Sequence, residues 1–431
     1  MLLIYTHKIT PRFTYTMKQI FGRILNMDIA FTTKVEDFIK HTEEKITYTK
    51  QPLQNEFFIR SNDLLFEQGI SDLQIQMGSW DGTPCFFSAG ERSAVPFDIF
   101  AASFFLLSRY EEYLPHVKDI YGRYPPSESL ALQHNFLHLP IVDIWARMFL
   151  KAMQERFPNL KTGQKEYKFN SIINVTISHC FANRGFIRTA VGFMLDLTSF
   201  RLKRVASRFM VLLGFRKDPY NNFSQLTEIH KAESIKSMFF FQFAEYSTYD
   251  KNISTNNNRF RYLIKSVADY SIVSLAASYV SFSKSDILKE EKKRLAQVIN
   301  RPVKYVRLRY NRVNVPDTYR NLVDVGFTDD FSMGYTHEIG FRAGTCTPFY
   351  FYDIHLELQQ PIKIHPFALH DYAFANEKNE NDIFNKIDGL YLEVKKVEGE
   401  FITIFSNELL GQKNNVDWMK LYENVLKKYH V

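Results

Sequence analysis

Short apolar segments alternate with helical segments from Phe169 to the end of the chain, and this alternation strongly limits the possible folds. Neighbouring parallel strands need long crossovers, so a repeated strand–helix order predicts a parallel sheet, for which a closed or nearly closed barrel is a natural form. The expected strands are 170–176, 236–243, 271–276, 303–308, 328–334, 362–367 and 400–406. The expected helices include 286–299, 316–325, 382–397 and 417–429, and a helical insertion at about 184–217.

The first 165 residues follow a different pattern, which predicts a smaller α+β domain. The apolar helix pattern at 97–113 extends almost all round, as is typical of a buried or interfacial helix. The charged stretch 161–168 places the domain boundary between 1–165 and 166–431. The other elements expected here are an edge strand at 1–5, strands at 57–60 and 72–77, and a helix at 141–157.

Composition narrows the class of protein. Hydrophobic residues make up 45% of the 431 residues and aromatics 16%, which supplies a large core and argues against disorder. The net charge of +7 favours anionic partners in general. Neither an Arg/Gly-rich tract nor zinc-finger spacing is present, so nucleic acid is not expected as a partner.

Cysteine usage and hydropathy bear on localisation. Cys85, Cys180 and Cys346 lie far apart, which suits neither a disulfide framework nor a metal knuckle and favours a reducing compartment. The apolar run at the N-terminus is too short for a signal peptide, and no stretch reaches the roughly 20 apolar residues that a membrane span needs. We therefore expect a cytoplasmic protein, with contact at the inner face of the membrane left open.

Four of the expected strands run into loops at the end where a barrel carries its catalytic groups. A metal hydrolase would place Asp and His there. This chain instead has Asn174, Thr176, Ala276 and Ser406 at those positions. The scaffold is that of an enzyme, whereas the expected metal-binding and proton-transfer groups are missing.

The segment Gly340–Asp353 is dense in Gly, Pro and aromatic residues. Together with the strand segments and the runs 96–103, 109–115 and 246–252, it resembles the polysaccharide deacetylase-like proteins of Bacteroidota, which carry an uncharacterised N-terminal domain before a carbohydrate esterase family four-type barrel. The resemblance covers nearly the whole chain. It implies a distorted (β/α) barrel of about seven strands that removes N- or O-acetyl groups with a divalent metal.

Carried over by this resemblance, the active-site pattern is degenerate. Asn174 and Thr176 stand where two acids belong, and Ala276 replaces a His ligand in the run Leu275-Ala276-Ala277-Ser278-Tyr279. Ser406 replaces the His general acid before Asn407-Glu408, and Arg309 stands at a further His position. We therefore predict no bound metal and no intact catalytic set. The candidates left to line a substrate groove are Arg307, Tyr310, Arg342, Thr345, Asp353, Asn407 and Glu408.

Two alternatives stay open at these positions. Arg342 is suited to a sugar carboxylate or to orienting Asp353, because its guanidinium fork matches a carboxylate, and it is equally suited to a loop-stabilising ion pair. A relocated site for zinc or another divalent ion would have to use scattered residues without a tight ligand pair. Those residues are His179, His337, Asp353, His355, His365 and His370.

The insertion at 184–217 is both basic and strongly apolar. One interpretation is peripheral docking on an anionic bilayer, with Arg201, Lys203, Arg204 and Arg208 as contacts. The favoured interpretation is a helical hairpin packed on the barrel with a solvated basic face.

For function, we predict a catalytically inactive, deacetylase-like protein that binds a glycan, a polysaccharide precursor or a protein partner in cell-envelope polysaccharide metabolism. One alternative is a divergent, metal-dependent deacetylase. The other is an interaction module for a membrane surface or a protein.

Overall fold

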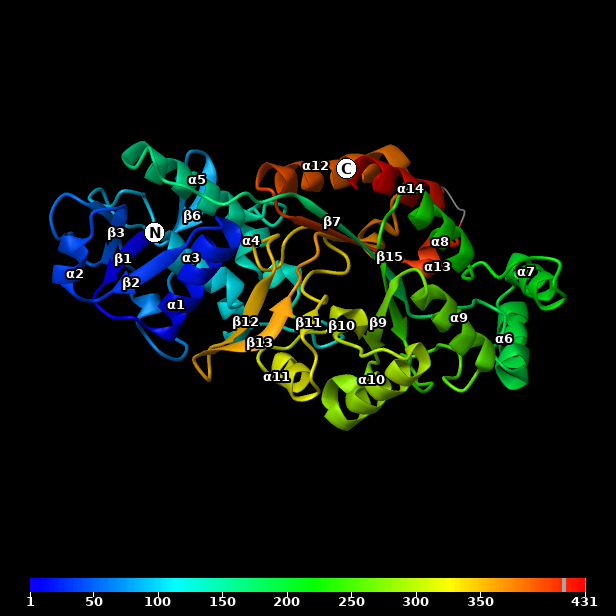
Figure 1. The fold of residues 1–431 in the computed structure, drawn as a ribbon. Helices are drawn as coiled ribbons and strands as arrows, with labels where there is room; N and C mark the ends of the chain where they lie inside the picture. The colour runs from blue at the N-terminus through cyan, green and yellow to red at the C-terminus, as the bar shows by residue number, and fades with distance from the viewer. Residues whose placement is uncertain (413–415, 431) are drawn as a thin grey trace.

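The computed structural model describes residues 1–412 and 416–430. Figure 1 shows an N-terminal part in blue and cyan beside a larger part in green to red, and each contains its own sheet. Two helices, α6 (Phe186–Thr198) and α7 (Leu202–Leu212), lie apart from both at the far end of the larger part.

The N-terminal part is built on a four-stranded sheet of order β2-β1-β3-β4, in which every neighbouring pair is parallel. The predicted edge strand at 1–5 is therefore wrong, because β1 has a partner on each side and its residues Leu2, Leu3 and Ile4 are buried. The N-terminal part also differs from the expected α+β organisation, because helices α1 and α2 connect strands that are parallel in the sheet. These elements are β1 (Leu2–Thr6), α1 (Pro11–Met17), β2 (Ile29–Thr32), α2 (Val35–Lys40), β3 (Lys45–Thr49) and β4 (Phe57–Arg60).

The remaining N-terminal elements depart from the sequence pattern at two points. The strand expected at 72–77 begins instead at Met77, because β5 (Met77–Trp80) pairs with β6 (Thr83–Phe86) around a turn at Asp81 and Gly82, which both have positive φ. The helix expected at 97–113 ends early, because Arg109 is left-handed (φ 55°). The helices are α3 (Ile99–Leu107), α4 (Leu130–Gln133) and α5 (Ile141–Arg156).

The larger part contains a nine-stranded sheet of order β12-β13-β11-β10-β9-β8-β7-β15-β14, parallel throughout except for β12. All seven expected strands are found within a few residues of their predicted places. The strands are β7 (Lys168–Val175), β8 (Met238–Gln242), β9 (Ile272–Ala277), β10 (Tyr305–Leu308), β11 (Asp329–Asp330), β12 (Phe349–Asp353), β13 (Leu358–Ile364), β14 (Leu369–His370) and β15 (Glu400–Ser406). The helices are α8 (Phe223–Ala232), α9 (Asn258–Ala268), α10 (Ser285–Ile299), α11 (Asp317–Asp324), α12 (Glu380–Lys396), α13 (Asn407–Leu410) and α14 (Trp418–Tyr429).

This sheet curves without closing by strand pairing in the part of the chain that the structure describes. The segment 365–368 bridges the gap: the amide of Phe367 donates to the carbonyl of Met333, and that of Ala368 donates to Ile402 on β15. A hydrophobic cluster separate from the main core fills the concave side of the sheet. Its buried residues are Ile172, Met238, Phe240, Ala276, Phe331, Phe367, Ile402 and Ile404. The structure is thus a large, mostly parallel α/β sheet with a packed interior, and the ladder of a closed barrel is not formed.

The loop 340–348 contacts the N-terminal part rather than lining an open groove. Asp143 of α5 accepts hydrogen bonds from the hydroxyl of Thr345 (2.6 Å) and the amide of Cys346 (3.0 Å). Gly344 has φ +65°, and a Cβ there would lie 2.9 Å from a Leu106 methyl group. The density of Gly and Pro in this loop therefore serves the contact between the two parts.

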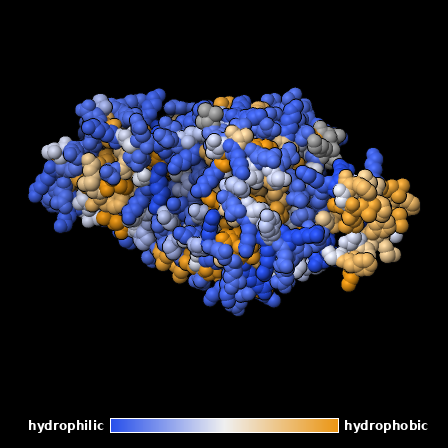
Figure 2. All heavy atoms as spheres, turned by 45° about the vertical axis from the view of Figure 1, so that its right-hand side comes forward, coloured by the Kyte–Doolittle hydropathy of each residue, from blue (hydrophilic) through white to orange (hydrophobic). Residues whose placement is uncertain are grey.

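The α6–α7 hairpin, residues 184–217, does not pack its apolar side chains on the sheet. Figure 2 shows it as an orange projection, separate from the mostly blue surface of the body. Phe186 and Phe200 are 88% and 87% exposed. The favoured prediction, a hairpin packed on the barrel with a solvated basic face, is therefore wrong, because the apolar side chains of the hairpin are exposed.

Candidate functional site

A cavity of ≈ 320 Å³ lies at the carboxyl ends of the parallel strands of the larger sheet. Parallel strands end at a common edge, so side chains that follow different strands converge there. Seven of the degenerate and groove positions singled out in the sequence line it: Asn174, Thr176, Ala276, Arg307, Arg309, Tyr310 and Glu408. The sequence therefore identified a real spatial cluster.

Strand register explains the convergence of the degenerate positions. Asn174 on β7 lies opposite Ser406 on β15, and Ala276 on β9 lies opposite Arg307 on β10. Thr176 is the first residue after β7, and its hydroxyl donates a hydrogen bond to the Glu408 carboxylate. Four strands thus contribute to one wall of the cavity.

Ser406 lies behind the cavity wall, where it contacts a buried carboxylate. Its amide and its hydroxyl both donate to Asp371, at 2.5 and 3.2 Å. The same carboxylate pairs with Nδ1 of His370 at 2.8 Å, and His370 lines the cavity. Burial lowers the pKa of His370 although Asp371 opposes that effect, so the imidazole is neutral at pH 7. The sequence analysis considered His370 only as one of several scattered candidates for a relocated metal site.

Glu408 supplies the cavity with a carboxyl group whose pKa is raised, so that its neutral form is favoured more than in an ordinary carboxyl group. Burial raises its pKa, while the hydrogen bond from Thr176 and the positive charge of Arg309 act in the opposite direction. Tyr372, another lining residue, lies 3.5 Å away through its hydroxyl. Glu408 is therefore poised to donate or accept a hydrogen bond with a bound ligand.

Two arginines carry positive charge into this region. Arg307 is fully buried, and its guanidinium donates to the carbonyl of Phe331 (2.6 Å) and the side chain of Asn311 (2.8 Å). Burial lowers the pKa of Arg307 to about 9. Arg309 is more accessible and lies 3.9 Å from Asp250. Arg307 thus shapes the wall, and Arg309 is the cation available to a ligand.

Aromatic rings also line the cavity. Tyr310 stacks on Tyr121 with ring centroids 4.7 Å apart and planes 14° apart. Tyr121 comes from the N-terminal part, so the cavity is built by both parts of the chain. Nothing in the local sequence around Tyr121 identifies it, because its role depends on how the two parts pack.

Four groove candidates lie outside this cavity because their polar groups are engaged elsewhere. Arg342 pairs with both oxygens of Glu112, at 2.9 and 2.7 Å, and does not orient Asp353. Asp353 pairs instead with Arg320, at 2.6 and 2.9 Å. The other two are Thr345, which donates to Asp143, and Asn407, which donates to the carbonyls of Ile177 and Tyr220.

The residues of the cavity do not fit a divalent metal. Asn174 offers an amide, Ala276 a methyl group, and the hydroxyl of Thr176 is spent on Glu408. His370, whose Nδ1 is held by Asp371, offers only its Nε2, a single ligand. Within residues 1–412 and 416–430, no three His, Cys, Asp or Glu side chains are grouped to hold an ion.

The remaining histidines considered for a relocated site are dispersed. His365 pairs with Asp329 (2.8 Å), and His355 packs against the ring of Tyr113. His179 contacts Ser178, and His337 joins His370 at the cavity wall. These placements give the relocated-metal alternative no coordinating cluster among the described residues.

Comparison with known proteins gives one family match and several distant structural likenesses. Residues 2–158 match the model of a family of unknown function, DUF7033. A comparison with curated proteins finds no match. Among solved structures, the chain is similar to a probable polysaccharide deacetylase from Pseudomonas aeruginosa PAO1 at 10% identity, over 61% of this chain and 84% of that one, with a TM-score of 0.39.

Two further solved structures show a comparable likeness. One is an allantoinase, at 11% identity over 73% of this chain and 90% of that one, with a TM-score of 0.39. The other is a CE4 family pseudoenzyme from Bacillus anthracis, at 9% identity over 60% of this chain and 62% of that one, with a TM-score of 0.28. At these TM-scores the likenesses decide neither fold nor activity, and the argument rests on the sheet and cavity described above.

Proposed function

We propose that this chain is a deacetylase-like protein that binds a glycan in cell-envelope polysaccharide metabolism without hydrolysing it. The observation that carries the proposal is the convergence of Asn174, Thr176 and Ala276 on one cavity. Their side chains supply neither a general base nor a set of metal ligands at the strand ends where a metal hydrolase needs both.

The cavity wall supports a sugar as the ligand. Small-molecule sites combine apolar surface with a few polar groups that fix orientation, in cavities of about 300–1,000 Å³. Here the stacked rings of Tyr121 and Tyr310 provide an apolar face. Arg309, Glu408 and Asn174 provide hydrogen-bonding groups around it.

Metal content and acetate release test the loss of hydrolysis. The protein as it exists is expected to carry no stoichiometric divalent metal by elemental analysis and to release no acetate from acetylated glycans. The variant Asn174→Asp, Thr176→Asp, Ala276→His, Ser406→His is expected to gain zinc, because it places carboxylate and imidazole groups at strand ends that converge on the cavity. Stoichiometric metal and acetate release by the unaltered protein would contradict the proposal.

Calorimetric titration with acetylated and deacetylated cell-wall oligosaccharides tests binding itself. Tyr310→Ala is expected to weaken binding by about 10-fold or more, because it removes the ring that stacks on Tyr121. Tyr262→Ala is the matched control, since Tyr262 is 74% exposed on α9 and outside the cavity. Equal affinities for the two variants would argue against this cavity as the glycan site.

A second candidate function, hydrolysis without a metal, is favoured by the pairing of His370 with Asp371. The carboxylate holds Nδ1, which leaves Nε2 as the group able to accept a proton, and Glu408 lines the same cavity as an acid with a raised pKa. Acetate release that persists in chelator and disappears in His370→Ala would select this function over simple binding.

A further inference from the structure

Exposed apolar side chains are concentrated on the α6–α7 hairpin, which Figure 2 shows as an orange projection. Continuous apolar patches of this kind mark interaction sites on soluble proteins. Side chains from both helices and from the loops at their ends contribute: Phe186, Ile187, Met194, Phe200, Leu202 and Phe215.

The two helices meet around one buried ion pair, and apolar side chains of both helices face outward. Asp196 of α6 and Arg208 of α7 are 5% and 4% exposed, and their carboxylate and guanidinium lie 2.5 Å apart. Arg208 packs directly over Gly192, where a Cβ would lie 2.7 Å from its guanidinium. This order inverts that of a helix pair in water, whose apolar stripes face each other. The arrangement suits a hairpin whose outer surface meets an apolar medium.

The hairpin also carries the whole charge excess of the chain. Residues 184–217 contain eight Lys or Arg and one acid, Asp196, a net of +7 that equals the formal net charge of all 431 residues. The rest of the sequence therefore contains equal numbers of basic and acidic residues. Asp196 is paired with Arg208 and lies 3.4 Å from Arg204, so the exposed cations Arg201, Lys203 and Arg216 act without a counter-charge from the hairpin's own acid.

A carboxylate at its base fixes the hairpin to the body. Asp218 accepts hydrogen bonds from the amides of Cys180, Phe181 and Ala182, at 2.7, 2.7 and 2.9 Å. It thereby joins the chain entering the hairpin to the chain leaving it. Arg188 adds a contact over the ring of Tyr246, with 4.4 Å between the guanidinium carbon and the ring centroid. The hairpin is therefore a preformed projection.

We propose that the α6–α7 hairpin docks this protein on the surface of an anionic lipid bilayer. Exposed Phe, Leu and Met side chains enter the boundary between headgroups and acyl chains, and the unpaired cations meet the phosphate groups. α6 has 13 residues and α7 has 11, and nowhere in 1–412 or 416–430 is a helix long and apolar enough to span a bilayer. The charge selects lipid over a second copy of the chain, because two hairpins of the same charge repel each other.

This mode of binding corrects one predicted contact. Arg208 was grouped with Arg201, Lys203 and Arg204 as a cation available to lipid, but it is buried in its pair with Asp196. Arg204 is shared, because it also approaches Asp196. The variants below therefore leave Arg204 and Arg208 intact so that the hairpin stays folded.

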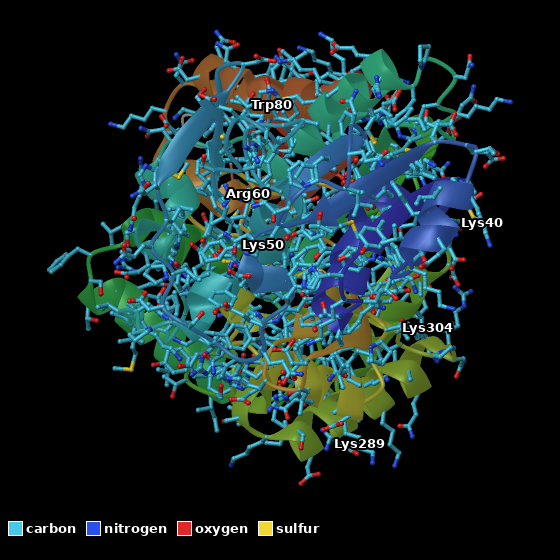
Figure 3. The ribbon with its side chains drawn as sticks, turned by 90° about the vertical axis from the view of Figure 1, so that its left-hand side faces the viewer. Lys40, Lys50, Arg60, Trp80, Lys289 and Lys304 are labelled. Carbon is cyan, nitrogen blue, oxygen red and sulfur yellow. The ribbon has the colours of Figure 1, made fainter. Side chains whose placement is uncertain are left out.

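Vesicle flotation of the full chain tests the charge requirement. The protein is expected to float with vesicles of equal parts phosphatidylcholine and phosphatidylglycerol at low salt, and to be released at high salt or from phosphatidylcholine alone. Arg201→Glu, Lys203→Glu, Arg216→Glu is expected to weaken binding by at least about 100-fold. The control reverses three surface lysines outside the hairpin, Lys40, Lys289 and Lys304, which appear at the rim of the view in Figure 3, and is expected to bind within about 10-fold of wild type.

A second pair of variants tests the apolar contact. Phe186→Ser, Phe200→Ser, Phe215→Ser is expected to abolish flotation without changing the circular dichroism spectrum, because all three side chains are at least 73% exposed. The control is Ile39→Ser, Ile120→Ser, Leu356→Ser, which removes exposed apolar side chains elsewhere and is expected to float normally. Phe200→Trp is expected to gain fluorescence quenching by brominated anionic lipid, relative to the unaltered chain.

The outcomes are decisive in either direction. Equal binding to neutral and anionic vesicles, or unchanged binding by either hairpin variant, would overturn the proposal. So would the absence of vesicle binding combined with a dimer, measured by light scattering, that the Phe→Ser variant converts to a monomer. Glycan binding is expected to be unchanged by all hairpin variants, so a failure of the glycan assignment remains distinguishable.

Discussion

Buried charge is the most consequential feature at the scale of single residues. Arg109, Arg342, Glu111 and Glu112 form a network at the contact between the two parts of the chain, and none of the four is more than 9% exposed. Burial on its own would raise the pKa of Glu112, but the guanidinium groups of Arg342 and Arg109 lower it below the usual range. Its charge therefore stabilises the fold above the ordinary carboxyl range and is lost as the pH falls through its lowered pKa.

Neutralising Glu112 tests this network. Glu112→Gln is expected to lower the free energy of unfolding by about 3–5 kcal/mol at pH 7, because it leaves two buried guanidinium groups with one carboxylate. Urea denaturation measures the change. Glu423→Gln, which removes the partner of Lys427 at the surface of α14, is the control and is expected to change the value by less than about 1 kcal/mol.

The pKa of Glu291 is shifted in the opposite direction to that of Glu112. Burial raises its pKa from 4.5 to about 7, and the hydrogen bonds from Ser278 and the charge of Arg294 oppose the shift only in part. The folded state therefore keeps a proton that the unfolded state loses above pH 4.5, so stability falls between pH 4.5 and 7 and is level above that. Glu291→Gln removes this titration.

Relative to wild type, Glu291→Gln is expected to become more stable by about 3 kcal/mol across that pH interval. Thermal or urea unfolding at a series of pH values measures the difference. Glu290→Gln changes the neighbouring, exposed residue and is expected to show no such trend. A pH-independent difference for Glu291→Gln would show that its carboxyl titrates normally.

At the scale of elements, the loop 340–348 decides how the N-terminal part meets the sheet. Gly344→Ala is expected to destabilise the protein by about 2–4 kcal/mol, because its φ is +65° and the added methyl would meet Leu106 and Ile141 of α3 and α5. Gly82→Ala carries the same backbone strain (φ +79°) with nothing within 4 Å, and is expected to cost about 1 kcal/mol. Equal losses in urea denaturation would show that the contact at Gly344 is not tight.

At the scale of the whole molecule, one hydrophobic cluster runs through both parts, from Ile4 and Phe100 to Tyr352 and Leu426. The chain is therefore expected to unfold in one transition although it contains two sheets. Trp145 in α5 and Trp418 in α14 are both buried and report on different parts. Variants that retain only one of them are expected to give coincident urea transitions, and a lower midpoint for Trp145 would show that the N-terminal part unfolds independently. The boundary at 165 stays a prediction.

Local pattern was sufficient for the strands of the larger sheet and for the cavity wall. Periodicity places β7, β9, β10 and β15, and the pairing of parallel strands then brings Asn174, Ala276 and Arg307 to one edge. Side-chain chemistry alone identifies Asn174, Thr176 and Ala276 as unsuited to a metal. These inferences could be made from the sequence because they depend on neighbours along a strand and on the common end of a parallel sheet.

Packing between distant segments decided the rest. Arg342 lies outside the cavity because it pairs with Glu112, 230 residues away in the sequence. Tyr121 lines the cavity although it belongs to the N-terminal part of the chain. The outward apolar faces of α6 and α7 have the amphipathic pattern of an ordinary surface hairpin, and only the buried pair of Asp196 with Arg208 reveals which face turns inward. Helical periodicity defines two faces, whereas tertiary contacts choose the one that is buried.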